Sequence, residues 1–212
     1  MRLITFSRLL AVVLFFAATA CTAESADGSK QRMGSGDPVA GQTESVLCQG
    51  CHGAEGISFV DLIPDLAGQQ APYIAKQLRD FQFGARTHQV MSPISKTIGD
   101  PDLADIASYF ASLKKTQGDG SGGNPVAAKL FLKGDPARGI PACASCHGAN
   151  GKAPVIATYP VIGEQHQAYL RIQLLHWRSG DRSNSPDGVM NRAAKNLSDG
   201  EIDALADYLS GL

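Results

Sequence analysis

The chain has 212 residues, of which 43% are hydrophobic, 18% charged and 7% aromatic. This composition is typical of a globular protein with one or two domains, and it excludes disordered, collagen-like and polytopic membrane chains. Nineteen basic side chains against twenty acidic ones leave a formal charge of −1. The sequence therefore offers no basic excess for nucleic acid, and we expect no nucleic-acid partner.

Residues 1–20 are predicted to be a signal peptide. Arg2 and Arg8 lead into an apolar run over 9–18, and Ala18 and Ala20 are the small residues that a signal peptidase recognises. The run is too short for a transmembrane helix, which needs about 20 apolar residues. We therefore expect the mature chain to be exported to the periplasm.

Residues 21–36 form a polar stretch containing Gly and Ser, which is expected to act as an N-terminal tether. The small residues that end in Cys21 resemble a bacterial lipoprotein box, although Ala18 stands where that box prefers leucine. A free thiol at the first mature position of an exported protein would be prone to oxidation. We favour a lipidated Cys21, which would associate the protein with a membrane, over simple cleavage after Ala20.

The rest of the chain consists of two copies of one unit, over 37–117 and 124–212, joined by a Gly-rich linker at 118–123. Each copy contains a Cys-x-x-Cys-His cluster, and several residues after it recur 96 positions later. They are Pro64, Gln69, Tyr73, Gln77, Leu78, Gly84 and Arg86 in the first copy and Pro160, Gln165, Tyr169, Gln173, Leu174, Gly180 and Arg182 in the second. Such an internal repeat predicts two domains with the same fold.

Both copies are predicted to be helical. Asp37 and Asn124 have side chains that cap helices, and each precedes a proline, which is favoured at the first helical position. Apolar residues spaced i, i+4 and i+7 predict further helices over 74–81 and 170–177.

A helix is also expected at the end of each copy. Asp100 is predicted to cap the first of these helices, with Pro101 opening it, and Ser198 and Glu201 form a capping-box pattern before the second. The sequence contains no long run of alternating apolar and polar residues, so the predicted fold class is all-α.

Four of the five cysteines lie in the two clusters, with Cys48, Cys51 and His52 in the first and Cys143, Cys146 and His147 in the second. This is the attachment pattern of c-type haem, in which both thiols bond to the porphyrin and the histidine reaches the iron. One helical turn carries both thiols on the same side. A disulfide, a redox-active dithiol pair and a shared zinc site are alternatives, but zinc ribbons separate their cysteine pairs by about 15 to 20 residues, much less than here. We predict two covalently bound haem c groups.

Met91 and Met190 are predicted to be the second axial ligands of the two irons. They occupy equivalent places before the terminal helices, where we expect loops, and Met33 lies in the tether. A thioether is a soft ligand that favours ferrous iron and raises the reduction potential. The rival ligands do not recur as histidines, because His88, His166 and His176 align with Asn184, Gln70 and Asp80.

Two further pairs of repeated residues have expected roles near the haems. A metal-bound imidazole usually donates its other ring N–H to a carbonyl, and the loops at Pro64 and Pro160 are candidates for that carbonyl. A turn that merely lets the chain pass around the haem is the alternative. Arg86 and Arg182 are either partners of haem propionates or solvated side chains.

Residues 37–212 resemble the tandem class I c-type cytochromes, most closely the dihaem "c-four" cytochromes of bacteria. The resemblance rests on the two Cys-x-x-Cys-His motifs, the segment from Pro64 with Tyr73 and Gln77, its repeat from Pro160, and both downstream methionines. It implies two small haem-wrapped helical domains whose haems face each other across an interdomain contact. It also implies a periplasmic carrier that passes electrons from a quinol-oxidising complex to a terminal oxidase, often of the cbb-three type. The chain departs from the family in its candidate lipid anchor and in eight extra residues before Cys143.

A carrier needs two six-coordinate irons and no small-molecule substrate. Its rival is a haem oxidoreductase, such as a dihaem peroxidase or a thiosulfate dehydrogenase, which needs an open or unusual iron position. A methionine in each repeat and the lack of a spare cysteine there favour the carrier. An electron-entry subunit of a larger dehydrogenase or oxidase is the third alternative, and co-purification would distinguish it.

Overall fold

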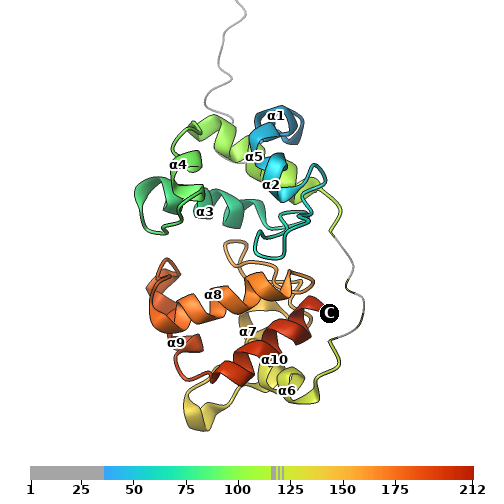
Figure 1. Ribbon diagram of the computed structural model, residues 1–212, viewed down its shortest axis with the longest axis vertical. Helices are drawn as coiled ribbons and strands as arrows, with labels where there is room; N and C mark the ends of the chain where they lie inside the picture. Colours follow the sequence, from blue (N-terminus) through green and yellow to red (C-terminus); the bar gives the residue numbers. More distant parts are fainter. Residues whose placement is uncertain (1–35, 116–117, 119, 121) are drawn as a thin grey trace, which may run out of the picture.

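The computed structural model describes residues 36–115, 118, 120 and 122–212, and it shows two helical bodies stacked along the long axis of the molecule (Figure 1). The predicted all-α class is confirmed. Among the described residues, extended pairing is limited to one isolated bridge between Asp135 and Ile140. The expected signal peptide, Cys21 and nearly all of the tether lie outside the described residues. No helix in the described part of the chain has the length and apolar character needed to cross a bilayer.

The first body contains five helices. They are α1 (Pro38–Glu44), α2 (Val46–His52), α3 (Ala71–Phe83), α4 (Met91–Ser95) and α5 (Asp100–Ser112). Helix α5 packs against both α1 and α3, and its apolar side chains Leu103, Ile106 and Phe110 are buried in the core of this body. The expected stripe over 74–81 lies on α3, where Ile74, Leu78 and Phe81 are buried.

The second body repeats this arrangement. Its α-helices are α6 (Pro125–Lys133), α7 (Ala144–His147), α8 (Gln167–Ser179), α9 (Val189–Ala194) and α10 (Asp199–Ser210), with short 3-10 helices η1 (Pro136–Arg138) and η2 (Pro186–Gly188). Helix α10 packs against α6 and α8. The extra segment before Cys143 contains η1, and Arg138 from η1 forms an ion pair with Glu201 at the start of α10.

The expected caps form at three helices. Asp37 accepts a hydrogen bond from the backbone N–H of Val39, and Asn124 accepts bonds from Val126 and Ala127. Ser198 and Glu201 form both bonds of a capping box. At α5 the boundary differs by one residue, because Gly99 is the extended N-cap residue and Asp100 already belongs to the helix. The carboxylate of Asp100 instead lies 3.7 Å from the guanidinium of Arg79 on α3.

The expectation that both methionines lie in loops was wrong. Met91 begins α4 and Met190 lies in the first turn of α9. These helices have five and six residues, which is too short for a helical repeat of apolar residues to show in the sequence. Each packs against the long helix before it, α4 against α3 and α9 against α8, so tertiary contacts stabilise them.

One buried residue ties the segment between the bodies to the second body. Glu164 accepts hydrogen bonds from the Gly118 backbone and the Lys152 ammonium, both at 2.7 Å, and its second oxygen lies 3.5 Å from the Lys115 ammonium. Its backbone has φ 62°, a left-handed conformation that is costly for a residue with a side chain. The equivalent residue of the first copy is Gly68, with φ 64°. The second copy therefore has a strained backbone at Glu164, where the carboxylate binds the segment between the two bodies.

Candidate functional site

The first cysteine cluster lies on α2 in the first body. Cys48, Cys51 and His52 share its last two turns, and the helix ends at His52 because Gly53 leaves the helical conformation with φ 81°. His52 is buried at 7% relative exposure, Cys48 is half-buried and Cys51 is exposed. One side of a short helix therefore presents two thiols and an imidazole at the border of the core.

The second cluster has the same arrangement. Cys143 is the N-cap residue of α7, Cys146 lies within the helix, and His147 is its last residue, with 6% relative exposure. All four thiols are free, so neither cluster forms the disulfide that the sequence left open. Burial raises the pKa of Cys48, and it raises the pKa of Cys143 to about 11.

Each histidine has its ring fixed by a backbone carbonyl. Nδ1 of His52 lies 2.8 Å from the carbonyl oxygen of Pro64, and Nδ1 of His147 lies 2.9 Å from that of Pro160. A carbonyl accepts a hydrogen bond, so Nδ1 carries the proton and Nε2 keeps its lone pair for a metal. The proposed role of the Pro64 and Pro160 loops is thus observed in both copies.

Burial also keeps the imidazoles neutral. It lowers the pKa of His52 and of His147, because the charged form loses hydration, and this effect outweighs the opposing hydrogen bonds to the two carbonyls. A neutral imidazole is the form that ligates iron. The chain therefore holds both rings in the tautomer and the charge state that coordination requires.

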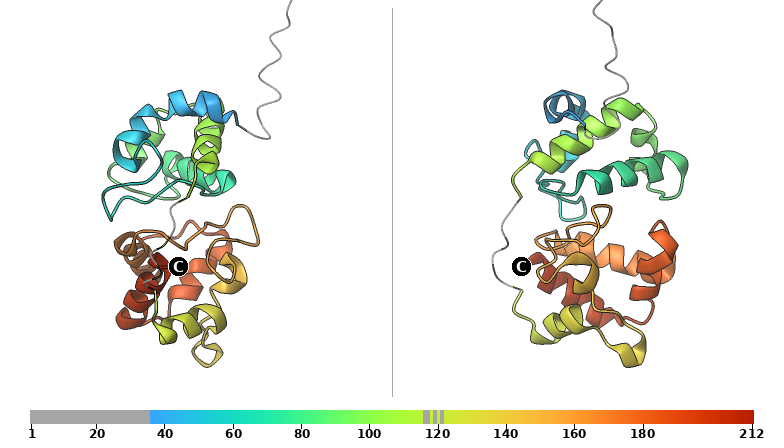
Figure 2. Two further views of the ribbon diagram at one scale, coloured as in Figure 1. Left: turned by 90° about the vertical axis from the view of Figure 1, so that its right-hand side faces the viewer. Right: turned by 180° about the vertical axis from the view of Figure 1, so that it is seen from behind.

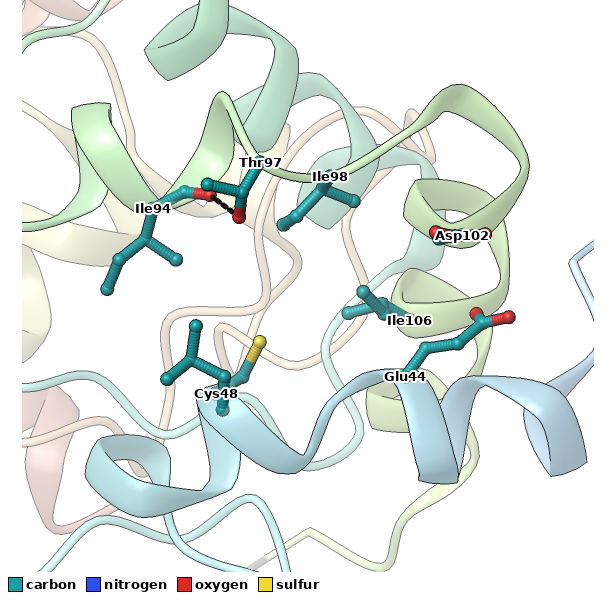
Figure 3. Close-up of a pocket in the computed structure, with 8 residues that line it drawn as sticks. Glu44, Cys48, Ile94, Thr97, Ile98, Asp102 and Ile106 are labelled. Carbon is teal, nitrogen blue, oxygen red and sulfur yellow. Dashed lines mark hydrogen bonds between the residues drawn. The ribbon is translucent and has the colours of Figure 1, made fainter.

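A hollow of about 160 Å³ lies beside the first cluster, between α2, α5 and the segment after Met91. Its apolar walls include Ile94, Ile98 and Ile106, and the sulfur of Cys48 points into it (Figure 3). Met91 and Cys48 both pack against the core of the first body, and Met190 and Cys143 pack against the core of the second. In each body, the cysteine helix and the methionine helix border the same apolar interior.

The rival histidines are engaged elsewhere. His88 is exposed, and its Nδ1 accepts hydrogen bonds from the backbone of Val90 and Met91. His166 lies at the boundary between the bodies, with Nε2 3.1 Å from the Asp65 carboxylate of the first body. His176 is half-buried on α8. Burial lowers the pKa of His88, and the nearby charges of Arg86 and His176 lower it further.

Arg86 and Arg182 lie at the contact between the two bodies rather than in solvent. Arg86 donates to Gln77 of its own body and to Tyr169 and Gln173 of the other. Among the described residues, every hydrogen-bond acceptor of Arg86 and of Arg182 is a neutral oxygen. Burial raises the pKa of Tyr169, but the charges of the two arginines outweigh it and lower the pKa. Two cations whose hydrogen-bond acceptors are neutral complement an anionic group such as a haem propionate.

The interdomain role of the repeated glutamines was missed from the sequence. Gln69 bonds both the N–H and the carbonyl of Val161, and Gln165 bonds those of Asp65, at 2.8 to 2.9 Å. The sequence carried one signal for this role, because the two glutamines recur 96 positions apart. A polar side chain that recurs in this way is not explained by packing in the hydrophobic core of its own copy. The two bodies thus meet through contacts that nearly mirror each other.

These features together fit haem. Each copy offers paired free thiols, a buried neutral imidazole with its Nε2 available, and a methionine at the border of the same interior. The bridging arginines place two positive charges at the contact between the bodies, where anionic groups such as haem propionates would be stabilised. A zinc site shared by the clusters does not fit, because the clusters belong to separate bodies with separate hydrophobic cores.

Comparisons with known proteins agree with this site. The cytochrome c family model matches residues 127–212. Cytochrome c4 of Thiocapsa roseopersicina is 41% identical over 182 residues, covering 84% of this chain and 93% of that protein. The thiosulfate dehydrogenase electron acceptor of Stutzerimonas stutzeri is 35% identical over 196 residues, covering 90% and 88%.

Among solved structures, reduced recombinant cytochrome c4 from Pseudomonas stutzeri superposes with a TM-score of 0.78 at 37% identity, covering 84% of this chain and all of that one. Each of these matches extends over at least 84% of this chain and at least 88% of the relative. The chain therefore belongs to the cytochrome c4 family, and it is a dihaem electron carrier with covalently bound haem c rather than an enzyme.

Proposed function

We propose that each body holds its haem through the residues that the repeat singles out. Cys48 and Cys51 attach the first haem and His52 and Met91 ligate its iron; Cys143, Cys146, His147 and Met190 do the same for the second. The observation that carries this proposal is the paired hydrogen bond from His52 to Pro64 and from His147 to Pro160, which leaves each Nε2 available.

The chain's own contribution is to hold each site in one geometry. Bound haem iron supplies a one-electron couple between ferrous and ferric states. The carbonyls of Pro64 and Pro160 keep the imidazole rings from rotating, and Ile94, Ile98 and Ile106 give the first site an apolar wall. A site that changes little between oxidation states transfers electrons with little reorganisation, which suits a carrier.

We further propose that the protein works in the periplasm and carries electrons from a quinol-oxidising complex to a terminal oxidase. The signal-peptide pattern over 1–20 supports export, and Cys21 supports a lipid anchor at the membrane surface. No small-molecule substrate is part of this function.

Oxygen uptake tests this route. Membranes that contain both complexes, stripped of soluble cytochromes, should consume oxygen from added quinol only when the holoprotein is returned. Uptake that is unchanged by the holoprotein would contradict the route. Labelling intact cells with a radioactive fatty acid tests the anchor, because only a lipidated Cys21 would carry the label and a Cys21→Ser chain would lose it.

Acceptance of electrons from a thiosulfate dehydrogenase is the second candidate function. It is favoured by the relative of that description from Stutzerimonas stutzeri, which this chain matches over 88% of its length. Purified thiosulfate dehydrogenase with thiosulfate should then reduce the holoprotein at a rate at least comparable with that of the quinol-oxidising complex. If only one of these two donors, the thiosulfate dehydrogenase or the quinol-oxidising complex, reduces the holoprotein, that result identifies its electron donor.

A further inference from the structure

The two haem-attachment helices lie on opposite sides of the molecule. Figure 2 (left) shows α2, in cyan, at the left of the upper body and the α7 segment, in gold, at the right of the lower body. In Figure 1 the same relationship places α2 toward the viewer and α7 behind α8. A partner that docks beside one cluster therefore leaves the other cluster accessible.

The surface around the first cluster is strongly apolar. We define the α2 face as Val46, Phe59, Val60 and Leu62, which have relative exposures of 65%, 97%, 50% and 59%. The loop that carries the last three contacts the cluster directly, because Ser58 donates a hydrogen bond to the carbonyl of Cys51. The ring of Phe59 is almost fully exposed, so it contributes almost no buried apolar area to the fold of this chain. Grouped apolar side chains of this kind are typical of a protein contact.

The second body has a weaker version of this surface. The structural alignment is fixed by Gly53 and Gly148, because a Cβ added at either glycine would clash with a backbone carbonyl oxygen, that of Ile57 in the first copy and that of Ala153 in the second. Phe59 and Val60 then correspond to Val155 and Ile156, and Leu62 corresponds to Thr158. On the helix side, Pro141 replaces Val46. The larger apolar side chains are therefore concentrated on the first body.

Charge separates the two surfaces further. Exposed Glu55 and Asp61 flank Phe59 in the first copy, whereas Asn150 and Ala157 take these places in the second, whose loop also contains Lys152. Over whole copies, 37–117 has nine acidic and six basic side chains, and 124–212 has eight acidic and nine basic ones. An apolar surface with an acidic border is complementary to an apolar surface with a basic border.

We propose that the α2 face is the docking surface for a redox protein whose own electron-transfer edge is apolar and bordered by lysine or arginine. This inference rests on the proposed carrier function and adds to it which body meets which kind of partner. In the docked pair, one electron passes from the ferrous iron of the first body to the oxidised partner. The first iron becomes ferric, the partner is reduced by one electron, and no bond or proton changes place.

Stopped-flow electron exchange tests this assignment. The reduced holoprotein is mixed with an oxidised, lysine-rich single-haem cytochrome c as the probe. Phe59→Ser/Val60→Ser should slow the exchange about tenfold, and the matched pair Val155→Ser/Ile156→Ser should change it less than twofold. Glu55→Gln/Asp61→Asn should also slow it and should flatten its dependence on salt, because steering between opposite charges weakens as salt rises.

Controls keep the folded state and the docking step apart. Unchanged visible spectra and midpoint potentials show that a variant retains both haems in place. If the Phe59→Ser/Val60→Ser variant fails to fold, the Glu55→Gln/Asp61→Asn variant tests the docking surface in its place. Equal slowing by both apolar pairs, or by neither, overturns the assignment. The assignment is also overturned if sedimentation shows a homodimer that the Phe59→Ser substitution dissociates, because the α2 face would then bind a second copy of this chain. If oxygen uptake by membranes persists while exchange with the probe ignores the α2 face, the docking inference fails and the carrier function stands.

Discussion

Arg86 and Arg182 share the same two glutamine acceptors, one from each body. Arg86 donates to the Gln77 and Gln173 side-chain oxygens at 2.9 and 3.0 Å, and Arg182 donates to the same oxygens at 2.9 and 2.7 Å. Each guanidinium also covers an aromatic ring of its own body, Arg86 over Phe81 and Arg182 over Trp177. The two positive charges therefore lie together at the contact between the two bodies.

Removing one of these charges is expected to lower both midpoint potentials. Arg182→Gln takes away a buried positive charge that disfavours ferric iron, so the ferric state gains stability in each body. The expected change is on the order of tens of millivolts, since about 59 mV is a tenfold change in a one-electron equilibrium. Optical redox titration of the holoprotein measures it.

Arg171→Gln is the matched control for this charge. Arg171 is exposed and pairs with Asp203 on the surface of the second body, so its loss is expected to leave both potentials within a few millivolts. Equal changes in the two variants would show that net charge matters and the position at the contact does not.

The chemistry-bearing residues were predictable from the sequence because they recur. The two clusters and the methionines stand at equivalent places, and the loops at Pro64 and Pro160 were among the candidates for the carbonyl partners of His52 and His147. The caps at Asp37, Asn124 and Ser198 followed from local side-chain chemistry, which needs no tertiary information.

The parts that the sequence did not show depend on contacts between distant residues. Helices α4 and α9 are too short for an apolar period, and they exist because they pack on α3 and α8. The interdomain hydrogen bonds join residues roughly 80 to 110 positions apart, and no local pattern reports such pairs. The repeat already aligns Glu164 with Gly68, but only the backbone showed that both adopt a positive φ.

Replacing either methionine should alter only the haem of its own body. Met91→Ala should lower the potential of the first haem, and Met190→Ala that of the second, by on the order of 0.1 V, because axial ligands set potentials over a range of about 0.8 V. Redox titration resolves the two haems, with the unaltered haem as the internal control. An unchanged potential in the substituted body would refute the ligand assignment.

Gly41 is expected to tolerate no side chain. A Cβ at Gly41 on α1 would lie 2.0 Å from the carbonyl oxygen of Asp105 on α5, so Gly41→Ala must separate the two helices. Overpacking of this kind costs about 1 to 3 kcal/mol of unfolding free energy. Gly200→Ala is the control on α10, where the described part of the chain leaves open space around an added Cβ, and alanine should there stabilise the helix by about 0.5 kcal/mol. Denaturant unfolding of both variants gives the comparison.

Glu164 should reveal backbone strain when its side chain is removed. Glu164→Ala and Glu164→Gly both release Lys152 and the Gly118 backbone, so both should destabilise the native state. The glycine variant should keep about 1 kcal/mol more stability, because only glycine adopts the positive φ without cost. Thermal unfolding at matched pH measures the difference, and equal stabilities would contradict a strained backbone at this position.

The ion pair between Arg138 and Glu201 should make the second body sensitive to acid. Hydrogen bonds from Arg138 lower the pKa of Glu201 to about 2, and those from Ser198 add to this effect. The unfolded carboxyl has its ordinary pKa of about 4.3. A carboxyl whose pKa is depressed on folding stabilises the native state above the unfolded value, and that contribution is lost as pH falls toward the folded value.

The stability advantage of the native chain over Glu201→Gln should therefore be complete near neutral pH and should shrink between about pH 4.3 and about pH 2. Denaturant midpoints of the two proteins, measured in parallel across this window, isolate the effect, because acid changes at the haems are common to both. An advantage that stays constant down to pH 2.5 would show that the carboxylate does not depend on Arg138 in the folded protein.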